Sequence, residues 1–160
     1  MSKRKERIFL KGFKYVPAFF LLLALLLPAL QAQAADKCWV GGSGWWDDAS
    51  NWSPSGLPAN GDTVYLTQSD GTDRTVSYWN TVYPSAVLST LRIDATGMGT
   101  MTLFQSQDPL SSNYERIGDS GTGSFTQSGG THTVSYLGLA NNSPGSGAYD
   151  LSGTGSLSAD

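Results

Sequence analysis

From residue 35 onward, apolar and polar residues alternate in short runs, and Gly, Asn, Asp, Ser and Pro separate the runs. Alternation with a period of two gives each run one apolar side, as in a half-buried strand. The apolar pairs that share a side are Val64 with Leu66, Val76 with Tyr78, Leu91 with Ile93, Met101 with Leu103, Val134 with Tyr136, Tyr149 with Leu151, and Leu157 with Ala159. The sequence shows no helical period of useful length here, so the pattern predicts an all-β chain.

The runs also repeat. The stretch that begins at Ile117-Gly118 matches the stretch that begins at Leu137-Gly138, and residues 121–125 (GTGSF) match residues 145–149 (GSGAY). A weaker copy begins at Leu91. The period is about 20 to 26 residues, which is typical of repeat architectures in which each copy is one structural unit.

Repeats of this length and composition predict a β-solenoid, in which each strand pairs with the equivalent strands of the rungs above and below. Equivalent side chains then form columns; those we expect are Phe125 over Tyr149, Ile117 over Leu137, and Val134 over Leu157. Glycines are expected at the corners, where the backbone adopts positive φ at low cost. A β-sandwich is the alternative fold, but it does not predict that one copy matches the next.

The first 34 residues have the layout of a signal peptide. A basic stretch over residues 1–14 precedes an apolar run over residues 18–30, and Ala32-Gln33-Ala34 supplies small residues for a signal peptidase. A spanning helix needs about 20 apolar residues, so an uncleaved anchor is the weaker interpretation. We expect cleavage after Ala34.

Cleavage changes the charge of the chain. Residues 35–160 hold four basic residues against twelve acidic ones, a net charge of about −8, whereas the full chain has −3. Nucleic acids are bound by clustered Lys and Arg that displace counterions, so a nucleic-acid partner is excluded. Cys38 is the single cysteine, so no disulfide forms within the chain.

Tryptophans gather at the start of this part of the chain: Trp39, Trp45, Trp46 and Trp52 lie within fourteen residues. We interpret residues 35–66 as a Trp-rich N-terminal cap that covers the first rung, because large aromatic rings bury much apolar area. Exposed tryptophans also stack on sugar rings, so the same four residues are candidate glycan contacts. Residues 67–160 form the repeats. No matching cap follows the last copy, so we expect a piece of a longer repeat protein.

The opening resembles that of large secreted bacterial repeat proteins. The matching positions are Trp39, Gly41, Gly42, Trp46, Asn51, Trp52, Pro58, Gly61 and Asp62. The later stretches GSFTQSGGTHTV and GAYDLSGTGSLSA resemble the glycine-rich strand repeats of the same proteins, which include autotransporter passengers and exported proteins with a PEP-CTERM sorting tail. The resemblance implies a β-solenoid at or beyond the outer membrane, mostly without catalytic activity.

Little else in the sequence points to chemistry. Gly121-Thr122-Gly123 lacks the third glycine of a dinucleotide fingerprint. His132 is expected to be a structural or solvent-facing histidine, since a general base needs an orienting acid and a nucleophile. The acidic pairs Asp47-Asp48 and Asp70-Asp73 could supply oxygen ligands to calcium, although ordinary turns use the same residues. We predict no catalytic residue, no cofactor and no metal site.

The predicted function is therefore structural: an exported, cell-surface or extracellular, adhesin-like β-solenoid without catalytic activity of its own. The alternative is a glycan-binding module that uses the four tryptophans, and a polysaccharide-active β-helix enzyme is the remote one. Surface glycans or matrix are the expected partners. We expect membrane contact only through the cleaved signal peptide or through a C-terminal anchor outside these 160 residues.

Overall fold

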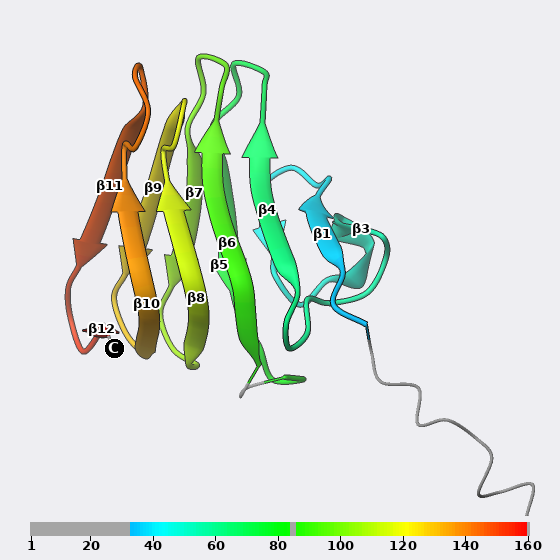
Figure 1. Ribbon diagram of the computed structural model, residues 1–160. Coiled ribbons are helices and arrows are strands. Elements are labelled where there is room, and N and C mark those ends of the chain that lie inside the picture. Colours follow the sequence, from blue (N-terminus) through cyan, green and yellow to red (C-terminus); the bar gives the residue numbers. More distant parts are fainter. Residues whose placement is uncertain (1–32, 84–85, 160) are drawn as a thin grey trace, which may run out of the picture. The chain divides into compact units, whose positions relative to one another are not determined.

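The computed structural model describes residues 33–83 and 86–159, and this part of the chain is built of strands (Figure 1). The predicted signal peptide lies outside the described residues except for residues 33–34. The elements are β1 (Asp36–Trp39), β2 (Gly44–Trp45), the 3₁₀ turn η1 (Ala49–Asn51), β3 (Trp52–Ser53), β4 (Thr63–Gln68), β5 (Arg74–Tyr78), β6 (Val87–Ala95), β7 (Met101–Gln105), β8 (Leu110–Ile117), β9 (Thr122–Gln127), β10 (Thr131–Leu139), β11 (Ser146–Leu151) and β12 (Ser156–Ala159). Within the described ranges, no helix is long and apolar enough to cross a bilayer.

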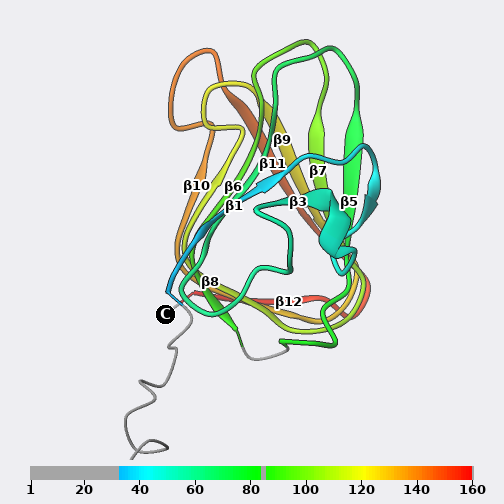
Figure 2. The same ribbon diagram turned by 90° about the vertical axis from the view of Figure 1, so that its right-hand side faces the viewer.

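The strands form two parallel stacks, and from β4 onward the chain crosses from one stack to the other at every turn. One stack is β1-β4-β6-β8-β10-β12, and the other is β2-β5-β7-β9-β11. Seen along the stack, successive rungs follow one another closely (Figure 2). The chain is therefore a β-solenoid, as predicted. The β-sandwich alternative is wrong, because successive copies pair in parallel within one sheet.

One of the three predicted columns is confirmed, and two have the wrong register. Phe125 lies opposite both Leu103 and Tyr149. Ile117, however, pairs with Leu139 rather than Leu137. Likewise Val134 pairs with Ala159, while Leu157 pairs with His132.

The backbone conformation at a corner explains the first register error. Gly118 has φ +62°, and its equivalent one rung later is Ala140, with φ +51°. Gly138, which the sequence match placed opposite Gly118, lies within β10 instead. Positive φ is rare at residues other than glycine, so a search for corner glycines does not find the corner at Ala140.

A bend within the long strands explains a second difference. The pairing of β8 with β10 runs from Val134 directly to Tyr136 and omits Ser135. Val134 is buried, whereas Tyr136 is exposed, so these two residues do not share a side as predicted. The strict alternation ends where the strand turns from one side of the rung to the next.

The core is a continuous column of apolar side chains between the stacks. Fully buried aliphatic and aromatic members are Val64, Leu66, Val76, Leu91, Ile93, Met101, Leu103, Ile117 and Phe125. Each large side chain contributes about 1.5–3 kcal/mol by leaving water. The predicted boundary between cap and repeats, at residues 66–67, falls inside β4, whose residues already stack on β6.

The Gly-x-Gly pairs have a packing role rather than a conformational one. Gly123 and Gly147 are in register on β9 and β11, and neither has a positive φ. A Cβ at Gly123 would overlap the carbonyl oxygen of Ile93, and one at Gly147 would overlap that of Ile117. The two stacks approach so closely at this corner that only glycine fits.

Buried glutamines tie neighbouring rungs together. Gln105 Nε2 donates to the carbonyls of Asp108 (2.7 Å) and Thr131 (3.2 Å). Gln127, directly opposite Gln105, repeats this with the carbonyls of Gly130 (2.9 Å) and Ser156 (3.1 Å). Each amide thus satisfies a carbonyl at its own corner and one in the next rung, where an unpaired group would be costly.

Candidate functional site

Three of the four predicted glycan-contact residues are core residues. Trp39, Trp46 and Trp52 are each at least 95% buried. Their rings meet edge to face, with centroids 5.1 Å apart for Trp39–Trp52 and 4.8 Å apart for Trp46–Trp52, and Trp46 also contacts Tyr78. The prediction that these three contact glycans is therefore corrected. Their faces already pack against one another and against the first rungs, so a sugar cannot stack on them.

Local hydrogen bonds hold this cluster. Trp52 Nε1 donates to the carbonyl of Trp46 (2.8 Å), and Trp39 Nε1 donates to that of Gly42 (2.9 Å). Asp48 begins the 3₁₀ turn and accepts from both Oγ and N of Ser50, which lowers the pKa of its carboxyl below the usual value. Asp48 therefore acts as a turn cap.

Trp45 is the exception among the four, since 56% of its surface is exposed. It lies on β2 opposite Ser77 of β5, and Trp79, 39% exposed, follows two residues after Ser77. The two indole rings are perpendicular (85°), with centroids 6.3 Å apart. Together with Asp47 they line a surface hollow of about 320 Å³.

This hollow has the chemistry of a small polar ligand site. Indole faces pack against the C–H faces of sugar rings, and an exposed carboxylate such as Asp47 accepts hydrogen bonds from hydroxyl groups. Sequence reasoning found Trp45 but missed Trp79. The signal was present, because Ser77 and Trp79 alternate with the inward residues Val76 and Tyr78.

A network of polar side chains around His132 is also buried in the core. His132 and Glu115 are fully inaccessible, with His132 Nε2 2.9 Å from Glu115 Oε2. His132 Nδ1 is 2.9 Å from Tyr149 Oη, and Tyr149 Oη donates to Gln127 Oε1. Because Tyr149 Oη donates to Gln127, it is free to accept from His132 Nδ1.

This network is structural. Burial and the nearby Glu115 charge raise the pKa of Tyr149 above its usual value. Substrate has no access to His132, whose ring packs against both Phe125 and Tyr149. Of the two positions predicted for this histidine, the structure shows the structural, inward one.

The aspartates of the acidic loops stabilise turns by accepting hydrogen bonds from backbone N–H groups. Asp70 accepts from the backbone N of Thr72 (3.0 Å) and pairs with Arg74, and these contacts lower the pKa of its carboxyl. Asp73 accepts from the backbone N of Thr100 in the neighbouring loop (2.8 Å). Among the described residues, no group of three His, Cys, Asp or Glu side chains is arranged to hold a metal ion.

Comparisons of the chain with protein-family models, with curated proteins and with solved structures returned no match.

Proposed function

We propose that this chain is an exported, cell-surface or extracellular structural protein, adhesin-like and without catalytic activity of its own. The observation that carries the proposal is the stack of rungs around a core filled by side chains. Such a scaffold exposes long, flat outer faces for contact with glycans, matrix or neighbouring proteins. The acidic balance of residues 35–160 is consistent with a partner other than nucleic acid.

The start of the fold supports export. Ala35, the residue after the predicted cleavage site, donates its backbone N to Asp62 Oδ1 (2.8 Å), and its carbonyl accepts from the backbone N of Thr63 (2.9 Å). Cleavage after Ala34 would leave every sheet hydrogen bond of β1 in place. It would also set a new α-ammonium beside the buried carboxylate of Asp62, a favourable pairing.

Expression of the full chain with a C-terminal tag in a Gram-negative bacterium tests the proposal. We expect a protein cleaved after Ala34, outside the inner membrane, whose producer cells attach to a glycan-coated surface better than cells that make residues 35–160 without the leader. N-terminal sequencing and cell fractionation read out export. Uncleaved protein in the cytoplasm, or secreted protein without any gain in attachment, would overturn the proposal.

A second candidate function is glycan binding at the hollow between Trp45 and Trp79. The exposed perpendicular indoles favour it, and Asp47 supplies an acceptor for hydroxyl groups. On an array of neutral oligosaccharides, Trp45→Ala and Trp79→Ala should each abolish binding without changing the thermal unfolding midpoint. Tyr83→Ala removes a similarly exposed aromatic ring elsewhere and serves as the control. Binding that survives both tryptophan substitutions would exclude this site.

A further inference from the structure

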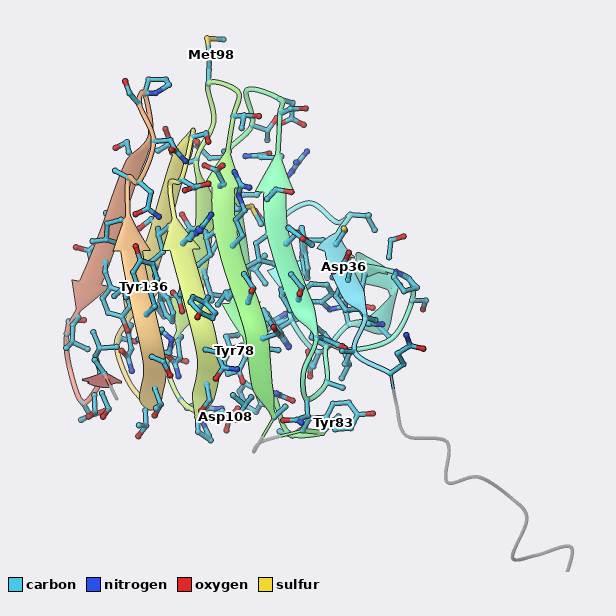
Figure 3. All side chains as sticks on the ribbon, in the orientation of Figure 1. Asp36, Tyr78, Tyr83, Met98, Asp108 and Tyr136 are labelled. Carbon is cyan, nitrogen blue, oxygen red and sulfur yellow. The ribbon has the colours of Figure 1, made fainter. Side chains whose placement is uncertain are left out.

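The outer face of the β4-β6-β8-β10 stack carries two columns in which tyrosine and arginine side chains recur. The first column is Thr63, Thr90, Tyr114 and Tyr136, and the second is Tyr65, Arg92, Arg116 and Gly138. We refer to Tyr65, Arg92, Tyr114, Arg116 and Tyr136 as the Tyr–Arg face. Tyr136 lies on the side of the sheet that faces the viewer in Figure 3. Neighbouring columns thus place aromatic rings beside guanidinium groups.

The arginines of this face have buried carboxylate partners beside them. Arg92 contacts Asp94 (2.9 Å) and Asp119 (3.2 Å) through the same nitrogen, Nη2. Both carboxylates are buried, and Asp94 also accepts from the backbone N of Gly121 (2.8 Å). Arg116 is 51% exposed, and its nearest carboxylate contact, with Asp119, is at 4.0 Å. Arg116 therefore presents its guanidinium group to solvent, whereas Arg92, 31% exposed, presents only part of a group that is already paired.

The face is hollowed rather than smooth. A depression of about 260 Å³ is lined by Tyr65, Thr90, Arg92, Tyr114 and Arg116. A second one, of about 430 Å³, shares Tyr65 and Arg92, continues toward Thr67 and Thr96, and is also lined by Asp94, the carboxylate paired with Arg92. The rings of Tyr114 and Tyr136 lie side by side, with centroids 6.1 Å apart. A ligand that runs across the strands would meet a ring or a guanidinium group about every 4.8 Å, the spacing of the strands.

We propose that the Tyr–Arg face binds a linear acidic polysaccharide, with uronate-type carboxylates on Arg92 and Arg116 and sugar rings against Tyr114 and Tyr136. Guanidinium groups bind carboxylates through paired hydrogen bonds, and tyrosine rings give flat apolar surfaces with a polar edge. Two arginines, one of them half-buried, are too few on an otherwise acidic protein for the counterion release that drives nucleic-acid binding. The Trp45–Trp79 hollow takes no part in this site.

The other stack provides an internal comparison. At the equivalent outward positions of β7, β9 and β11, the side chains are Thr102, Phe104, Ser124, Thr126, Ala148 and Asp150. These residues include no basic group and a single aromatic ring. Both stacks have the same parallel backbone, so the Tyr–Arg pattern is not a requirement of the fold.

Titration of the exported, processed chain with oligogalacturonate tests the proposal, with the methyl-esterified oligomer as the neutral control. A fluorophore on Cys38, which is exposed and in register with Tyr65 on the same face, reports binding, and calorimetry confirms it. We expect binding to the acid that weakens with added salt, and little binding to the ester. Arg116→Gln should weaken binding about tenfold or more, as expected for a lost hydrogen bond to a charged group. Tyr114→Ala should weaken it as well.

The matched control is Arg74→Gln, which removes an arginine that is paired with Asp70 at the start of β5 in the other stack. It should change the affinity less than twofold. Thermal unfolding must be unchanged in the Arg116 and Tyr114 variants, whose side chains are exposed. Equal affinity for the ester, full binding by Arg116→Gln, or stronger binding to oligo-dT than to oligogalacturonate would each overturn the proposal. None of these results would overturn the proposed scaffold function, because cells could still attach through other parts of the protein.

Discussion

The first and the last described rungs differ in how completely their apolar side chains are buried. In the first rungs, Trp39, Trp46 and Trp52 are buried against one another, and Trp46 also packs on Tyr78. At the other end, β11 and β12 have one stacked neighbour each, and Leu151 remains 49% exposed. Phe125, which has neighbours on both sides, is completely buried. Burial in this fold therefore depends on the rung's neighbours rather than on the residue itself.

The loop over the first rungs is held by specific contacts. The buried Lys37 ammonium donates to the carbonyls of Pro54 (3.1 Å), Ser55 (3.4 Å) and Gly56 (3.1 Å). Asp62 accepts from the backbone N of Ala59 (2.8 Å) as well as from Ala35. These contacts pair a buried charge at each end of the loop, so neither charge is buried without a partner.

The largest effect is expected for Trp46→Ala at the covered end. Removing a fully buried tryptophan from contact with Trp52 and Tyr78 should lower the free energy of unfolding by about 3–5 kcal/mol. The matched change one residue earlier, Trp45→Ala, should cost less than about 0.5 kcal/mol, because that ring is exposed. Denaturant unfolding of both variants measures the difference. Equal losses would mean that Trp46 is not part of the core.

The buried His132–Glu115 pair between the two ends gives the next largest effect. Glu115→Ala leaves a buried histidine without its partner and should cost about 3 kcal/mol. The double change Glu115→Leu with His132→Phe removes both polar groups, so it should recover most of that loss. Thermal unfolding of the two variants measures whether the double change recovers the lost stability. A double variant as unstable as the single one would contradict this account of the pair.

Tyr78 should give a smaller, pH-dependent effect. Burial raises the pKa of its hydroxyl to about 12, and Tyr78 donates to the carbonyl of Pro109 at 2.9 Å. The unfolded chain ionises near pH 10 and the folded chain only near 12, so stability from this group falls as pH rises through that window. Tyr78→Phe should cost about 1 kcal/mol at pH 7 and flatten the loss between pH 10 and 12. An unchanged pH slope in the variant would refute the assignment to Tyr78.

The smallest effect belongs to the last described rung. Leu151→Ser should change the free energy of unfolding by less than about 0.5 kcal/mol, because about half of that side chain already contacts water. Leu103→Ser, at an equally apolar position in an inner rung, should cost several times more. Urea midpoints of the pair give the comparison, and similar losses would show that the outer rung is as well packed as the inner ones.

Much of the fold could be predicted from the sequence, because repeated sequence units form equivalent strands that stack on one another. The Phe125–Tyr149 column was predictable, since Gly-x-Gly precedes both residues at the same distance. The register at Ile117 was not, because Ala140 adopts a conformation normally reserved for glycine. No local pattern marks the bend at Ser135 that turns Tyr136 outward.

The candidate sites were harder to predict than the fold. Four clustered tryptophans look alike in sequence, and only the path of the chain decides that Trp45 alone faces solvent. The Tyr–Arg face brings together residues from four different rungs, so it exists only once the register is known. Trp79 could have been found from its alternation with Val76 and Tyr78.

Side-chain NMR contacts test the stacking of rungs most directly. In the isotope-labelled chain, the ring of Phe125 should show nuclear Overhauser contacts both to the methyl groups of Leu103 and to the ring of Tyr149, 4.8 Å away between centroids. Contacts to both residues are the result that this account predicts. A Phe125 ring that contacts neither, with β9 paired to antiparallel neighbours, would contradict it.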